Sequence, residues 1–105
     1  MDYKFYDSSA LLRLEELPKK GVISSITDEY LDNHSLEVYD YKPYMLFPLM
    51  NEMEHLMITE SIRCLACAVD YDKNVHPDET IFVTAIKPVA ELANKFFGED
   101  SIILL

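Results

Sequence analysis

Strand-like and helix-like segments alternate along this chain, and the alternation limits its fold more than any other feature. Runs rich in β-branched and aromatic residues predict strands at residues 3–7, 22–23, 36–40, 81–84 and 101–105. Capping residues and apolar residues at helical spacing predict helices after residue 8, after residue 25 and over 44–57, 60–71 and 88–97. Such alternation is typical of a parallel sheet covered by helices. We expect an α/β fold with about five short parallel strands and helices on both faces, in three Rossmann-like layers.

Short polar and glycine signals predict where these helices begin and end. Ser8 or Ser9 is the expected cap of the first helix, which should end near residues 17–18. A capping signal over residues 25–28 opens the second. Gly98 is expected to stop the last helix in a left-handed conformation.

The length of the chain and its apolar content indicate a single domain. At 105 residues there is room for one hydrophobic core, and 50% of the residues are hydrophobic. We find no linker, repeat or low-complexity tract. Residues 1–105 are therefore expected to form one unit.

The charge balance is strongly acidic, which favours some partners over others. Nineteen Asp and Glu face nine Lys and Arg, for a formal net charge of −10. Phosphate backbones reward basic residues, so direct binding of nucleic acid is not expected. Excess negative charge suits docking on a basic partner protein, such as one that itself binds nucleic acid.

The sequence also points to a compartment. No run approaches the roughly eighteen apolar residues of a membrane span, and residues 1–9 lack the pattern of a secretory signal. Cys64 and Cys67, the two cysteines, suit a reducing environment. We expect a cytoplasmic protein without a membrane partner.

One strand ends in residues of an unexpected type. The segment TIFVTAIKP, residues 80–88, reads as a buried strand followed by Ala85 and Ile86. In an open α/β sheet, ligands and catalytic groups lie at the carboxyl ends of the strands. Polar residues would be the usual occupants of these positions.

Four segments, in order, resemble the PIN domain, the α/β fold of metal-dependent ribonucleases, in its phage and bacterial phosphate-starvation form. They are KFYDSSALL, VISSIT, ITESIRCLACAVDY and DETIFVTAIKPVAELANKFFG. The resemblance covers most of the chain and implies a PIN-like fold. It also implies that a helical hairpin is missing between Asp32 and Leu36.

The resemblance implies a metal site, and most of its expected acids are replaced. The family's carboxylates converge on divalent metals that activate water. Asp7 matches the first of them, whereas Tyr30, Ser61 and Ile86 occupy the other three positions. A hard cation needs several oxygen ligands, so no cofactor is expected. If the chain is active, Asp7 and Glu60 are the predicted catalytic residues and ligands of Mg²⁺ or Mn²⁺, with Glu29 as a further acid alongside Tyr30.

Two other groups of residues have both a structural and a functional interpretation. Cys64 and Cys67 have the spacing of half a zinc site, but no second pair accompanies them, and core packing is the favoured interpretation. Methionines and tyrosines concentrate between residues 39 and 57, where adaptable binding surfaces and core packing are both plausible. Tyr44 and Met50 lie off the apolar stripe and are the predicted partner contacts.

Two functions from different classes follow. The first is a catalytically degenerate PIN-like domain, a pseudoenzyme that binds protein, for which a phage-encoded inhibitor of a host nucleic-acid-targeting defence complex is one form. The alternative is a divalent-metal-dependent ribonuclease with a rearranged acidic site. A purely structural module is a third, weaker interpretation. The apolar terminal strand has an edge that can pair with another strand, so a homodimer is a further alternative.

Overall fold

The computed structural model describes residues 3–29, 31, 34–40 and 59–105. Within these ranges five strands form one parallel sheet in the order β3-β2-β1-β4-β5. The strands are β1 (Tyr3–Tyr6), β2 (Val22–Ser24), β3 (Glu37–Tyr39), β4 (Thr80–Thr84) and β5 (Ile102–Leu104). The helices are α1 (Ser8–Arg13), α2 (Ser25–Asp28), α4 (Thr59–Asn74), α5 (Lys87–Ala93) and the 3₁₀ helix η3 (Glu99–Ser101). The predicted α/β class with a parallel sheet and flanking helices is confirmed.

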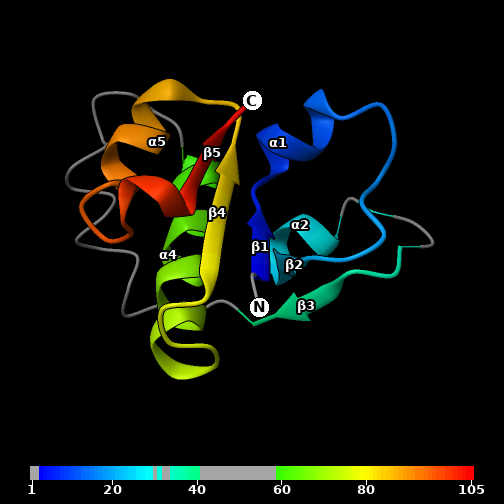
Figure 1. Cartoon of the computed structure of the whole chain (residues 1–105). Helices are drawn as coiled ribbons and strands as arrows, with labels where there is room; N and C mark the ends of the chain where they lie inside the picture. The colour runs from blue at the N-terminus through cyan, green and yellow to red at the C-terminus, as the bar shows by residue number, and fades with distance from the viewer. Residues whose placement is uncertain (1–2, 30, 32–33, 41–58) are drawn as a thin grey trace.

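The strand order places the start of the chain at the centre of the sheet. From β1 the chain moves outward through β2 to β3, and α4 then leads back to β4 on the other side of β1 (Figure 1). The order therefore reverses between β1 and β4, which pair in register from Tyr3↔Thr80 to Tyr6↔Val83. Ligands of open α/β sheets bind in the crevice at such a reversal, outside the carboxyl ends of the strands.

Helices cover the two faces of the sheet unequally. On one side, α4 and α5 pack on Phe5, Val22 and Phe82 to form the larger core cluster. On the other side, α1 covers a smaller cluster with its buried residues Ala10 and Leu11. Figure 1 shows α4 and α5 on one side of β1 and β4, and α1 on the other. Two faces packed in this way make three layers.

The apolar period of α4 explains its place in the core. Ile62, Leu65, Ala66 and Val69 recur at helical spacing, and all four are buried. Cys64 and Cys67 are buried side chains of the same helix, which agrees with the core interpretation. The helix runs from residue 59 to residue 74, longer than the predicted 60–71 at both ends.

Hydrogen bonds attach the edge strand β3 to the far end of α4. The hydroxyl of Tyr39 donates to the buried carboxylate of Asp70, which also accepts from Asn74 Nδ2 at 3.0 Å. Tyr71 donates to Glu37 Oε2 at 2.9 Å. These bonds pair buried polar groups that would otherwise destabilise the core.

Four predicted helix ends are wrong. Asp7, rather than a serine, caps α1, which already ends at Arg13. Ser24, one residue before the predicted signal, caps α2. Gly98 has φ −67° and lies beyond α5, which ends at Ala93. The caps that form are Asp7 and Ser24, whose side chains accept from Ala10 N and Thr27 N, and α5 has Asn94 as its C-cap in place of a glycine.

Some predictions fall outside the described residues. These are the helix expected over 44–57, the predicted partner contacts Tyr44 and Met50, and Tyr30, where the PIN resemblance expects an acid. Among the helices that the structure describes, none is long and apolar enough to cross a membrane. β5 forms one edge of the described sheet, and its pairing with a second copy stays a prediction.

Candidate functional site

Asp7 lies at the carboxyl end of β1, at the reversal of strand order. Its backbone N–H donates to the carbonyl of Val83 at 3.0 Å, which continues the pairing with β4. Its Oδ1 accepts from Ala10 N at 2.8 Å, as an N-cap carboxylate does. The side chain is fully buried. Asp7 therefore joins the central strand to the first helix.

Two hydroxyl groups complete the surroundings of the Asp7 carboxylate. Ser9 Oγ donates to Oδ1 at 2.6 Å, and Thr84 Oγ1 donates to Oδ2 at 2.6 Å. Each hydroxyl also accepts a backbone N–H: Ser9 from Ala85 at 3.0 Å, and Thr84 from Ile86 at 3.2 Å. We call Asp7, Ser9 and Thr84 the carboxylate lock. It connects the start of α1 to the end of β4 and the start of α5.

The carboxylate lock does not fit a metal ion. Both oxygens of Asp7 already accept short hydrogen bonds inside a water-excluded position. A Mg²⁺ site needs open carboxylate oxygens and room for water ligands. Within the described ranges, no group of three or more His, Cys, Asp or Glu is arranged to hold a metal ion.

Glu60, the second predicted acid, lies in a different environment. It is in the first turn of α4 and half-buried. With Ser8 and Leu11 it lines a pocket of about 340 Å³ to which Asp7 does not contribute. No hydrogen bond joins the two carboxylates. Glu60 thus lies at a pocket that is also lined by Ser8, the residue after Asp7, and the pairing of the two acids at one metal stays a prediction.

The pocket at Glu60 is mainly apolar, and we call it the α1–α2 pocket. Its remaining lining residues are Leu12, Thr27 and Leu31. Leu12 is 88% exposed, although it belongs to a helix that packs on the sheet. A concave apolar surface with one carboxylate suits an apolar side chain that is followed by a cationic group.

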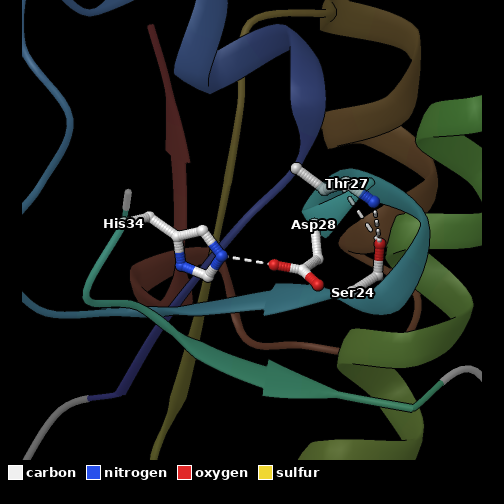
Figure 2. Close-up of polar contacts among 4 residues, drawn as sticks. All are labelled: Ser24, Thr27, Asp28 and His34. Atoms are coloured by element: carbon white, nitrogen blue, oxygen red, sulfur yellow. Dashed lines mark hydrogen bonds and ion pairs between the residues drawn. The ribbon is translucent and has the colours of Figure 1, made fainter. Parts of the chain in front are cut away.

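Hydrogen bonds fix the α2 wall of this pocket. Ser24 Oγ accepts from Thr27 N at 3.2 Å and lies 3.1 Å from Thr27 Oγ1 (Figure 2). The Sγ atom of Cys64 is 3.4 Å from Thr27 Oγ1 and 3.6 Å from Ser24 Oγ. Burial raises the pKa of the Cys64 thiol, and the two hydroxyls oppose this in part. Cys64 is therefore a packed thiol beneath the pocket wall.

His34 adds a link on the outer side of α2. Its Nε2 contacts Oδ1 of Asp28, which is the last residue of the helix, and Figure 2 shows the ring pointing at that carboxylate. This contact holds the chain after α2 against the helix. A short helix of four residues has little stability of its own, so such contacts and the Ser24 cap maintain the wall.

The structure describes two of the three positions at which the PIN resemblance expects a further acid, Ser61 and Ile86. Ser61 is buried within α4. Ile86 precedes α5 as its N-cap without a side-chain hydrogen bond, and its side chain packs against the larger core cluster. Ser9 and Thr84 were not predicted as partners of Asp7. The only sequence signal for them was a pair of hydroxyl residues placed directly after one strand and at the end of another.

The fold and this site define a three-layer α/β domain with a closed carboxylate lock and an adjacent apolar pocket. A scan against protein-family models finds no match to the chain. Searches of curated proteins and of solved structures find no match either.

Proposed function

We propose that this chain is a catalytically degenerate PIN-like domain that acts by binding a protein partner. The observation that carries the proposal is the carboxylate lock. The one acid that matches the PIN pattern accepts hydrogen bonds from Ser9, Ala10 and Thr84, and is fully buried. A carboxylate held in this way stabilises the fold instead of coordinating a reacting centre.

The α1–α2 pocket supports the choice of partner. One of its walls is the exposed side chain of Leu12, and no hydrogen bond or ion pair joins the Glu60 carboxylate to a described residue. The whole chain carries a formal net charge of −10. A basic protein with a protruding apolar side chain matches both features, because complementary charge accelerates encounter while apolar contact supplies affinity.

A basic protein of a nucleic-acid-handling complex fits this description. We propose that the chain occupies such a partner's basic surface in place of nucleic acid, as a phage-encoded inhibitor of a host defence complex would. Cys64 and Cys67 are buried and form no disulfide, which suits the proposed cytoplasmic setting. Dependence of the complex on ionic strength is expected, because exposed charges are screened by salt.

Affinity capture with matched variants tests the binding surface. The wild-type chain, Leu12→Asp and Leu17→Asp are immobilised and exposed to the same lysate. Leu17 is 41% exposed and does not line the pocket, so it controls for a new surface charge. A basic protein retained by the wild type and by Leu17→Asp, and lost with Leu12→Asp, is the expected result. Equal retention by all three baits would contradict the pocket as the contact.

Ribonuclease assays test the absence of catalysis separately. Single-stranded RNA is incubated with the wild type and with Asp7→Asn, in Mg²⁺ and in Mn²⁺. We expect no cleavage above background in any sample. Metal-dependent cleavage that disappears in Asp7→Asn would establish the alternative function, a ribonuclease with a rearranged site at Asp7 and Glu60.

A further inference from the structure

A second concave surface lies at the opposite end of the sheet from the carboxylate lock. It is a pocket of about 630 Å³ at the amino ends of the central strands. Lys4 of β1 lines it together with Lys19 and Lys20, from the loop between α1 and β2. In Figure 1 this loop runs from α1 down to β2, on the same side of the sheet as α1. We call this surface the lysine pocket.

The gathering of lysines here is unusual for so acidic a chain. Three of its nine basic residues line one pocket, while acids outnumber bases by nineteen to nine. None of the three ammonium groups forms an ion pair with a described residue. Positive charges that line one pocket without a carboxylate partner repel each other, so a bound anion would offset that repulsion.

The loop that carries two of these lysines is held in place. Gly21 has φ +152°, and a Cβ atom there would lie 2.5 Å from Cε2 of Tyr6. Its carbonyl accepts from Glu37 N at 2.9 Å. Two residues before Gly21, the carbonyl of Lys19 accepts a hydrogen bond from the hydroxyl of Ser35 at 3.2 Å. The lysines therefore extend from a backbone that is fixed before any ligand arrives, which lowers the entropic cost of binding.

The other walls set the charge and size of the ligand. Tyr6 supplies an apolar side, and Glu37 is the carboxylate among the lining residues. Glu37 already accepts a hydrogen bond from Tyr71 at 2.9 Å, on the side of the larger core. The pocket therefore has three ammonium groups and one carboxylate, which is already hydrogen-bonded to Tyr71. The net charge of its lining residues is positive. A volume of about 630 Å³ is in the range of sites for small organic ligands.

We propose that the lysine pocket binds a small anion that carries several phosphate charges. Lysine ammonium groups pair with phosphate oxygens as mobile point charges, and three of them suit a diphosphate or triphosphate. A long nucleic acid is disfavoured, because the strand would extend from this local positive region over a surface with a net charge of −10. The pocket is distinct from the α1–α2 pocket and does not depend on the function proposed for it.

Isothermal titration at low ionic strength tests the inference with two probes, inorganic triphosphate and ATP. The full chain is compared with a Lys19→Gln/Lys20→Gln double variant and with Lys87→Gln, an exposed lysine that does not line the pocket. We expect the double variant to bind about tenfold more weakly or worse. Lys87→Gln and Leu12→Asp should bind like the wild type.

The binding of the two probes decides whether phosphate groups alone are recognised. Binding of both probes with the expected loss shows that phosphate alone is recognised, and binding of ATP alone shows that the nucleoside contributes; either supports the proposal. No binding of either probe at millimolar concentration would overturn it, as would an unchanged affinity in the double variant. Tighter binding of a single-stranded oligonucleotide than of both probes would replace the small anion with a polymer and also overturn it.

Discussion

At the scale of single residues, hydrogen-bond partners decide what the charged groups of this protein do. Asp7 matches the first acid of the PIN pattern, yet in the structure its carboxylate joins the carboxyl end of β1 to α1 and to the end of β4. Two hydroxyls and one backbone N–H donate to its carboxylate, which leaves neither oxygen unpaired. A residue type that suggests catalysis in a sequence can therefore have a purely structural role when donors surround it.

Removing the carboxylate of Asp7 should destabilise the fold. Asp7→Ala leaves Ala10 N–H and the hydroxyls of Ser9 and Thr84 without their acceptor, at a cost of about 2–4 kcal/mol in the free energy of unfolding. Urea denaturation measures this change. Asp7→Asn keeps an acceptor for Ala10 and Ser9, and its amide can donate to Thr84, so a smaller loss of about 1 kcal/mol is expected. Equal stability of wild type and Asp7→Ala would contradict a structural role.

The two glycines of the chain should respond differently to the same substitution. Gly21→Ala places a methyl group 2.5 Å from Tyr6 Cε2 on a backbone with φ +152°, so we expect a loss of about 1–3 kcal/mol. Gly98→Ala is the matched control, because nothing lies within 4 Å of its added Cβ and its φ is −67°. Its stability should change by less than about 0.5 kcal/mol. Thermal denaturation of both variants checks the difference, and similar losses would contradict the close approach to Tyr6.

At the scale of elements, a tertiary contact sets the end of one helix, whereas a local backbone preference sets the start of another. α1 stops at Arg13, although the apolar pattern continues to Leu17, because Leu14 turns to pack against the smaller core cluster. α5 begins after Ile86, which offers no side-chain cap. Pro88 opens that helix with a preset backbone angle, so a polar cap is dispensable there.

Ile86 therefore provides a test of the position at which the PIN resemblance expects an acid. Ile86→Asp should add a capping bond to α5 worth about 1 kcal/mol and lose part of the contact with the core, so net stability should change little. We expect no metal-dependent RNA cleavage from this variant, because Asp7 remains closed and Ser61 is buried. Ile86→Asn is the control, since it caps without a charge. Cleavage by Ile86→Asp alone, measured on single-stranded RNA with Mn²⁺, would mean that the carboxylate lock opens.

At the scale of the whole molecule, burial couples stability to pH. Burial raises the pKa of the Cys64 thiol above its ordinary 9.0. Burial and then the hydrogen bond and charge of Glu37 raise the pKa of the Tyr71 hydroxyl above 10.0. Burial also raises the pKa of Tyr6. In the folded state all three groups therefore retain their protons at pH values where the unfolded chain has lost them.

The protein should consequently become less stable in alkali. Where the folded state binds more protons than the unfolded state, the free energy of unfolding falls as pH rises. The stabilising contribution is fully present below about pH 8 and is lost progressively above pH 9 to 10, the ordinary pKa range of these groups. Urea denaturation at pH 7, 9 and 10.5 measures the loss. Tyr71→Phe should show a shallower decline, and a stability that rises over this range would contradict the sign.

Some features of this protein could be predicted from sequence because they depend on local periodicity. The buried stripe of α4 at Ile62, Leu65, Ala66 and Val69 follows from burying one face of a helix. The order of the five strands along the chain follows from short apolar runs. The acidic composition is likewise visible in the sequence, and so is the lack of a carboxylate at Ser61 and Ile86, where the PIN resemblance expects one.

The tertiary structure alone decided which distant groups meet. Ser9 and Thr84 are 75 residues apart, and only the pairing of β1 with β4 brings both hydroxyls to Asp7. Lys4 reaches the loop of Lys19 and Lys20 because Gly21 allows that loop to lie against Tyr6. The spacing of apolar residues along the sequence predicts which residues are buried, because burial is a property of each residue by itself. Hydrogen bonds and charge clusters depend on pairs of residues, and the fold sets their distance.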